Sequence, residues 1–378
     1  MPKSGSAVDV AVVGGGVIGC SVAYHAARRG AKVALFEAEG IGSGASGAAA
    51  GMLAAQAEAH EPGPFLDLLL TSRELHKALA PELYEETGLD PEYVWSGTLR
   101  VALDERFARE LADKHSWHRQ AGLSAGWLDR EEARELQPGL SSAAIAALYL
   151  PEDGQVNSPR LVRALALAAI RNGAEVAEAE RVVGFSTEGG RVTGVRTVRE
   201  EVPAGSVVLA GGALSGLLSA VLGLRLPVHP VKGEILTVTT RPDTIKANVW
   251  DNRCYLVPKR DGRVVVGATE VPGDYDRRPT LGGVAKLSGA AAELLPELGA
   301  ATFVGAWGGL RPGTYDGLPI LGTIYGLEGL LLATGHYRNG VLLAPVTGEV
   351  VSALALGETP TVDIAPFSHE RLMETSQP

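Results

Sequence analysis

The feature that most constrains this chain is a glycine fingerprint between two short apolar runs. Residues 9–13 (DVAVV) form a β-branched run, and the glycines of a G-x-G-x-x-G pattern follow at once, namely Gly14, Gly16 and Gly19. Small and apolar residues continue at helical spacing, and residues 31–37 (AKVALFE) read as a second buried strand. The pattern predicts a strand–helix–strand unit with parallel strands and a right-handed crossover.

A fingerprint in this position suits a dinucleotide. The first glycine allows a tight turn, the second lets the backbone approach a pyrophosphate, the third permits close helix–strand packing, and the helix N-terminus adds partial positive charge. Glu37 ends the second strand 18 residues beyond Gly19, where a carboxylate accepts hydrogen bonds from an adenosine ribose and repels a 2′-phosphate. The alternative is a glycine turn beside a surface glutamate. Strand, helix and acid together favour an adenine dinucleotide and leave open which one.

Two kinds of β-structure alternate along the chain. Residues 157–173 (NSPRLVRALALAAIRNG) read as a helix capped by Ser158, and the strands after it, with a turn at Gly189-Gly190, resume the first sheet. Residues 227–269 instead hold three alternating runs with a hairpin turn at Asp261-Gly262, which is typical of antiparallel sheet. We therefore predict an α/β fold, in which a Rossmann-type dinucleotide-binding domain (residues 1–90, 145–224 and 305–378) is interleaved with a mostly antiparallel α+β substrate domain (residues 91–144 and 225–304).

Composition excludes several classes of partner. The formal net charge of −10 leaves no broad basic surface for nucleic acid, so we expect a small-molecule partner. The two cysteines, Cys20 and Cys254, provide neither a disulfide framework nor a clustered thiolate metal site, and together with a start that lacks a clear signal peptide they favour the cytoplasm. Residues 207–224 are uncharged for 18 residues, but Gly211-Gly212 and the serines favour a buried strand–turn–helix over a membrane span.

A stretch of small residues bears on the choice of dinucleotide. Residues 39–57 (EGIGSGASGAAAGMLAAQA) are mostly glycine, alanine and serine. Side chains this small let the backbone approach a flat ring system. A flavin enzyme keeps its ring system inside the same chain, in a groove lined by small side chains. A nicotinamide enzyme does not need such a groove. The alternative, a flexible surface loop, is weakened by Met52 and Leu53, which favour burial.

Six stretches resemble the D-amino-acid oxidase superfamily of FAD enzymes, and within it the glycine oxidases linked to thiamine biosynthesis. They extend from residue 12 to residue 345 and read VVGGGVIG, ASGAAAGML, CYLVP, VVVGAT, GLRPGTYDGLPILG and GHYRNGVLLAP. The last two are far more specific than the glycine fingerprint. The resemblance covers nearly the whole chain.

The resemblance implies that FAD is bound noncovalently. Besides the fingerprint glycines, the positions that hold it in this family read here Val17, Ile18, Glu37, Ala38, Ala45, Ser46, Ala50, Gly51, Met52, Val182, His336, Tyr337, Arg338, Asn339, Gly340, Val341 and Leu342. Ala45 and Gly47 stand where some relatives have hydroxyl residues, so some pyrophosphate hydrogen bonds would come from the backbone. The related sarcosine oxidases attach flavin through a cysteine in the C-terminal third, where this chain has none after Cys254.

The resemblance also implies a substrate site. Arg311 and Tyr255 would hold the substrate carboxylate with Arg338 beside them, either as a second contact or over the flavin ring, and Met52 and Trp250 would line the pocket. A guanidinium fork binds a carboxylate bidentately, and a phenol adds a neutral donor. The alternative for both arginines is pairing with surface carboxylates, but each lies in a charge-poor, glycine-rich segment. Arg253 would either face solvent, which we favour, or attract a second carboxylate.

We expect oxidation of an amine next to a carboxylate: glycine, sarcosine or small D-amino acids would give an imine, then a 2-oxo acid and ammonia, while oxygen gives hydrogen peroxide. For glycine, the imine would supply the thiazole of thiamine. One alternative is an FAD-dependent D-amino-acid or sarcosine dehydrogenase that passes electrons to another carrier. A second alternative is a dinucleotide-binding scaffold without activity. The resemblance further implies a homo-oligomer.

Overall fold

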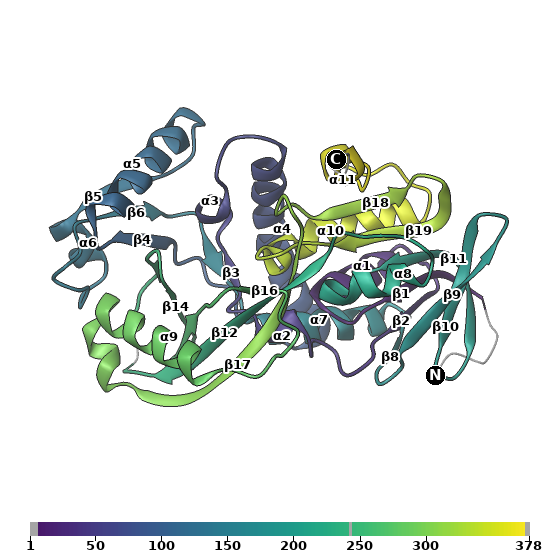
Figure 1. Ribbon diagram of the computed structural model, residues 1–378, viewed down its shortest axis with the longest axis horizontal. Helices are drawn as coiled ribbons and strands as arrows, with labels where there is room; N and C mark the ends of the chain where they lie inside the picture. Colours follow the sequence, from purple (N-terminus) through teal and green to yellow (C-terminus); the bar gives the residue numbers. More distant parts are fainter. Residues whose placement is uncertain (1–6, 242–243, 375–378) are drawn as a thin grey trace.

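Two sheets organise the residues that the computed structural model describes, which are 7–241 and 244–374. The first sheet has eight strands in the order β18-β19-β10-β11-β1-β2-β8, with β9 paired to β10. Its strands are β1 (Val8–Val13), β2 (Val33–Phe36), β8 (Glu175–Ala177), β9 (Val182–Glu188), β10 (Arg191–Thr197), β11 (Glu201–Leu209), β18 (Ile320–Ile324) and β19 (Leu327–Thr334). It forms the right half of the molecule in Figure 1.

The predicted strand–helix–strand unit is confirmed. β1 lies parallel to β2 on one side and to β11 on the other, and helix α1 (Val17–Arg28) connects β1 to β2. Val10 and Val12 belong to one buried cluster and Ala11 and Val13 to another, because successive side chains point to opposite faces of the sheet. Both faces are therefore covered, which explains the continuous apolar runs in the sequence.

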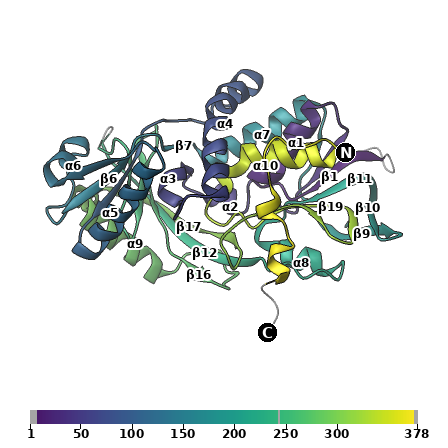
Figure 2. The ribbon, with the colours of Figure 1, turned by 90° about the horizontal axis from the view of Figure 1, so that it is seen from above.

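Helices cover the first sheet on the side of α1. Three others pack in this layer, namely α4 (Pro64–Thr87), α7 (Ser158–Arg171) and α10 (Gly340–Ala355), and Figure 2 shows α1, α7 and α10 side by side. Helix α7 was expected to be capped by Ser158, but its N-cap is Asn157, whose side chain accepts from Arg160 N. The Ser158 hydroxyl instead donates to the Ser46 carbonyl at 2.5 Å, which commits it to a contact outside the helix.

The second sheet has nine strands in the order β16-β12-β15-β14-β13-β4-β6-β5, with β17 paired to β12. Its strands are β4 (Thr98–Ala102), β5 (Gly126–Asp129), β6 (Ala146–Leu150), β12 (His229–Thr239), β13 (Asn248–Trp250), β14 (Tyr255–Pro258), β15 (Arg263–Gly267), β16 (Val271–Pro272) and β17 (Thr302–Gly313). Nearly all its pairings are antiparallel, including the predicted β14–β15 hairpin. Helices α5 (Glu105–Gln120), α6 (Arg130–Leu136) and α9 (Leu281–Leu294) accompany it at the left of Figure 1.

Two predicted boundaries fall inside or beside strands of this second sheet. β17 pairs with β12 from residue 302 to residue 313, so the second sheet continues past residue 305 and the chain re-enters the first sheet only at β18. β6 also belongs to the second sheet. The glycines after Gly305 suggested a nucleotide-binding strand, but they lie in β17, where Gly309 lets β17 approach helix α2 (Ala45–Ala48) closely.

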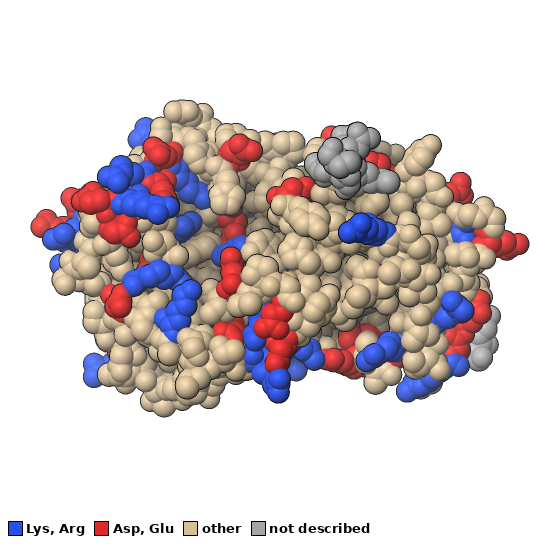
Figure 3. All heavy atoms as spheres, in the orientation of Figure 1, with Lys and Arg blue, Asp and Glu red and all other residues tan. Residues whose placement is uncertain are grey.

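The remaining elements are short connections. They are β3 (Met52–Leu53), α3 (Ala55–Glu58), β7 (Gly154–Gln155), η1 (Gly212–Leu214), α8 (Ser215–Ala220), η2 (Pro296–Ala300), η3 (Ala365–Phe367) and α11 (Arg371–Glu374). Residues 207–224 form the end of β11, η1 and α8, as the strand–turn–helix interpretation predicts. Within 7–241 and 244–374, no helix is long and apolar enough to cross a membrane. Figure 3 shows acidic and basic side chains mixed over one face.

Candidate active site

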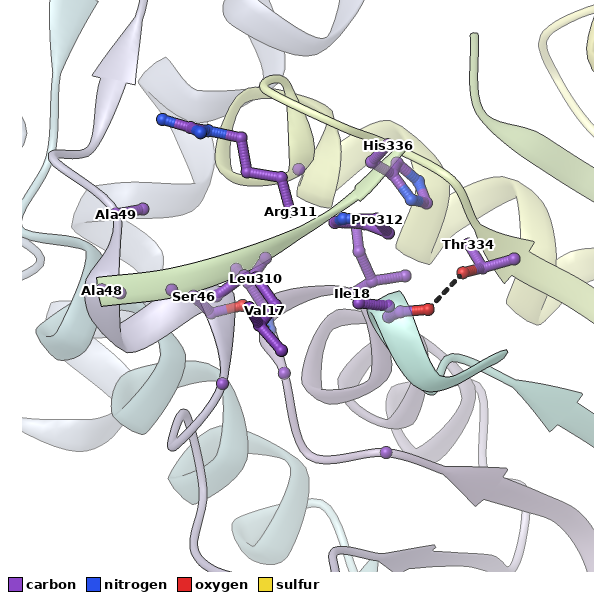
Figure 4. A pocket seen from close by; sticks show the side chains of 18 of the residues that line it. Val17, Ile18, Ser46, Ala48, Ala49, Leu310, Arg311, Pro312, Thr334 and His336 are labelled. Atoms are coloured by element: carbon purple, nitrogen blue, oxygen red, sulfur yellow. Dashed lines mark hydrogen bonds between the residues drawn. The ribbon is translucent and has the colours of Figure 1, made fainter. Parts of the chain in front are cut away.

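A cavity of about 610 Å³ lies where the two sheets meet. Its wall is built from the start of α1, the small-residue segment, β12, β17 and the start of α10. In Figure 4, Leu310 points from β17 toward Val17 and Ile18, whereas Arg311 extends from the opposite side of the strand. This alternation along one strand gives the cavity an apolar side near α1 and a cationic side away from it.

The fingerprint forms the part of the cavity next to α1. Gly14 has a φ of 114°, and a Cβ there would lie 2.4 Å from the Ala210 carbonyl oxygen, so no larger residue fits. At the N-terminus of α1 the amide of Val17 donates to the Ser46 hydroxyl at 2.9 Å. Glu37 accepts from the amide of Gly15 at 2.7 Å, which fixes its carboxylate at the carboxyl end of β2. A pyrophosphate and a ribose fit these groups.

The small-residue segment forms a second wall. Ala45, Ala48, Ala49 and Ala50 all line the cavity, and α2 packs against β17. Lys259, which the sequence analysis did not single out, holds this segment from behind, since its ammonium donates to the Ala50 carbonyl at 2.7 Å, to Gln155 at 2.8 Å and to the Val156 carbonyl at 3.0 Å. Burial lowers the pKa of Lys259 to about 7. The small side chains of this wall leave space for a flat ring system.

Arg311 and Tyr255 converge at the far end of the cavity. The Arg311 guanidinium donates to the Thr269 carbonyl at 3.1 Å and lies flat over Gly233, where a Cβ would be 2.4 Å from Nη1. Within the described ranges, Arg311 forms no ion pair with a carboxylate. Burial raises the pKa of Tyr255 although Arg311 opposes the shift, so the phenol stays protonated and can donate. One cation and one neutral donor thus face the cavity together.

Arg338 is placed differently from Arg311. Its Nε donates to both oxygens of Glu58, at 3.0 and 3.1 Å, and its Nη1 contacts Glu270. The expectation of a charge-poor setting is therefore wrong for this arginine. Burial alone would lower the pKa of Arg338, but Glu58 and Glu270 outweigh burial and raise it.

Trp250 and Arg253 lie outside the cavity wall. The Trp250 ring packs edge-on against Tyr255, with a centroid distance of 6.1 Å, and its centroid is 4.3 Å from Cζ of Arg100 and 5.3 Å from Cζ of Arg338. It supports the site from behind. Arg253, for which a solvent-facing position is favoured from the sequence, is 36% exposed and pairs with Asp251 and Glu293.

Most of the predicted site residues line this one cavity. They are Gly14, Gly16, Val17, Ile18, Glu37, Ala38, Ala45, Ser46, Ala50, Gly51, Met52, Val182, Tyr255, Arg311, His336, Tyr337, Arg338, Asn339, Gly340 and Val341. Gly19 and Leu342 do not line it: Gly19 packs against Gly14, and Leu342 is buried in α10. Glu58, which is not among the predicted site residues, lines the cavity at the end of α3. The only sequence signal for it was that it is the first carboxylate after residues 40–57.

Comparisons with known proteins agree with this geometry. Residues 9–354 match the family described as FAD dependent oxidoreductase. The chain is 44% identical to a glycine oxidase of Geobacillus kaustophilus over 366 residues, which is 96% of this chain and 97% of that protein. A crystal structure of glycine oxidase from Geobacillus kaustophilus superposes with a TM-score of 0.93 at 43% identity, covering 96% of this chain and 98% of that one. A bifunctional protein ThiO/ThiG of Synechocystis is 37% identical over 98% of this chain and 55% of its own length.

Proposed function

Since this chain belongs to the FAD dependent oxidoreductase family, we propose that it oxidises glycine and other small amines or D-amino acids with oxygen as the electron acceptor. The products are an imine, which hydrolyses to a 2-oxo acid and ammonia, and hydrogen peroxide. The observation that carries the proposal is the Arg311 guanidinium, which forms no ion pair with a carboxylate among the described residues and lines the same cavity as the Tyr255 phenol and the glycine fingerprint. The oxidases among the similar proteins favour oxygen over the carrier-dependent dehydrogenase.

The cofactor would be held without a covalent bond. The N-terminus of α1 would face the pyrophosphate, Glu37 the ribose and the alanines of α2 the ring system, with residues 336–341 along the far wall. Both cysteines are buried, and neither lines the cavity. When bound, FAD supplies the two-electron acceptor for the substrate α-hydrogen and returns the electrons to oxygen.

Arg311 and Tyr255 would orient the substrate. The guanidinium takes the carboxylate bidentately and the phenol donates a further hydrogen bond, so the α-carbon is fixed relative to the ring system. Catalysis by orientation needs no acid–base residue once the amine is deprotonated. The start of α10 lines the cavity at Gly340 and Val341, where its backbone amides favour developing negative charge.

We propose that the imine of glycine supplies thiazole synthesis for thiamine, which the similarity to a bifunctional ThiO/ThiG protein supports. The two free cysteines favour the cytoplasm. We propose a homo-oligomer, for which light scattering of the holoenzyme is the measurement, and an interleaved pair of domains that correspond to the two sheets.

Anaerobic stopped-flow absorbance tests the function directly. Purified holoenzyme is mixed with glycine, sarcosine, D-alanine or D-proline, and the flavin absorbance is followed; a second experiment under air measures peroxide. We expect bleaching by at least one of these amines and peroxide in equal amount to the amine consumed. A flavin that none of them bleaches would refute the oxidase, and bleaching without peroxide would favour the dehydrogenase.

A further inference from the structure

The charged side chains at the substrate end of the cavity divide into two unequal groups. Arg311 faces the cavity and has no carboxylate partner in the part of the chain that the structure describes, whereas Arg338 is bound by Glu58 and Glu270. Of these four, Arg311, Arg338 and Glu58 line the cavity. One cation is therefore available to a ligand, and the second is already neutralised.

We propose that Glu58 makes this site selective for amines with a single carboxylate, because it occupies Arg338 and so prevents that guanidinium from accepting a second anion. The inference rests on the proposed function, in which Arg311 binds the first carboxylate. A ligand with two carboxylates would bring its second one close to Glu58, and like charges in a partly buried site repel.

The position of Glu58 is suited to this role. Its side chain is only 13% exposed, and both its oxygens accept from Nε of Arg338. Displacing Glu58 would leave a largely buried carboxylate without its partner, which is costly. Glu270 is 43% exposed and does not line the cavity, so solvent screens its contribution.

The backbone next to Glu58 is also fixed. The carbonyl of Ala57 accepts hydrogen bonds from Arg100, at 3.2 Å, and from Lys114. These two basic side chains do not line the cavity, so they hold the end of α3 and offer no second anion site. The backbone before Glu58 is thus held by Arg100 and Lys114, and its carboxylate is held by Arg338.

Binding of inert carboxylates to the oxidised holoenzyme tests the proposal without turnover. Succinate carries two carboxylates, and succinamate, its monoamide, has nearly the same shape with one. Kd for each is measured from the perturbation of the flavin absorbance, in the unmodified protein, in Glu58→Gln and in Glu328→Gln. The last removes the same charge from a side chain that is 80% exposed and pairs with Arg191, outside the cavity.

We expect the unmodified protein to bind succinamate more tightly than succinate. In Glu58→Gln the ratio of Kd for succinate to Kd for succinamate should fall about tenfold, as expected for one unit charge within about 8 Å after solvent screening, and the shift should shrink at high salt. Glu328→Gln should leave the ratio unchanged. An unchanged or higher ratio in Glu58→Gln would overturn the proposal.

Two further measurements keep the outcomes separate. If Glu58→Gln does not retain FAD, Glu270→Gln is used instead, with a fall of about threefold expected because that carboxylate is more exposed; no change there would then count against the proposal. If succinamate does not perturb the flavin of the unmodified protein, the carboxylate site of the proposed function is itself wrong. If glycine bleaches the flavin and only the ratio fails to move, the role of Glu58 alone is refuted.

Discussion

Replacement of Gly233 by alanine would test whether the position of the Arg311 guanidinium controls the reaction. A Cβ at this position would lie 2.4 Å from Nη1, 2.5 Å from Nη2 and 2.6 Å from Cζ of Arg311. Non-bonded heavy atoms approach to about 3.5 Å, so the guanidinium has to move by about 1 Å. A shift of that size in a substrate-orienting group costs on the order of 10²-fold in rate. We therefore expect kcat/KM for glycine to fall about 100-fold, or about 2.7 kcal/mol of transition-state stabilisation.

The assay combines steady-state peroxide formation with the flavin absorbance of the purified variant. FAD content should stay at the level of the unmodified protein, because Gly233 lies on β12 at the substrate end. Gly305→Ala is the matched control on the paired strand β17, where a Cβ would meet no atom of the described residues within 4 Å, and it should remain within about twofold of the unmodified protein. Unchanged kcat/KM in Gly233→Ala would refute the reasoning. An equal loss in Gly305→Ala would assign the effect to general disturbance of the sheet.

Three other variants give separate expectations. Arg311→Lys keeps the charge but loses the planar fork, so KM for glycine should rise about 10- to 100-fold at constant FAD content, and an unchanged KM would contradict carboxylate binding there. Arg338→Ala should lower the rate of flavin reduction far more than FAD content, whereas equal losses would assign Arg338 to cofactor retention. Burial lowers the pKa of His76 from 6.5 to about 4, so the stability that depends on its neutral form is complete above pH 6.5 and is lost as the pH falls toward 4. His76→Gln should therefore reduce the loss of unfolding free energy between pH 6.5 and pH 5 by about 2 kcal/mol. The melting temperature should then fall less steeply between pH 6.5 and 4.5, and an unchanged slope would contradict this.

Much of the fold could be predicted from local pattern. The β1–α1–β2 unit combines a β-branched run, a glycine turn and a helical repeat, each of which is decided by neighbours in sequence. The cap of α7 was less certain, because Asn157 and Ser158 are both good caps, and a contact of Ser158 with a residue 112 positions away decides between them. The extent of β17 could not be predicted for the same reason, since β17 is identified by its pairing with β12 and not by its own composition.

The candidate site shows the same division between local and distant information. The glycine fingerprint and Glu37 lie within one unit, and their spacing alone indicates a dinucleotide. The partners of Arg338 are 280 and 68 positions away. Sequence spacing gives no information on pairs this far apart, so a glycine-rich neighbourhood suggested an unpaired cation where the fold places two carboxylates.

The difference between the two arginines follows from where each is attached. Arg311 projects from β17, an edge strand of the second sheet that pairs with β12. Its guanidinium lies over Gly233 of β12 and donates to the Thr269 carbonyl, and neither can neutralise a cation. Arg338 lies in the turn between β19 and α10, within reach of the end of α3 and the loop after β15, and each of these brings a carboxylate. A substrate carboxylate lowers the free energy most at Arg311, which forms no ion pair with any described residue, because there it replaces water and displaces no carboxylate. The architecture therefore directs one carboxylate to Arg311 and leaves Arg338 and Glu58 to set the charge that the rest of the substrate meets.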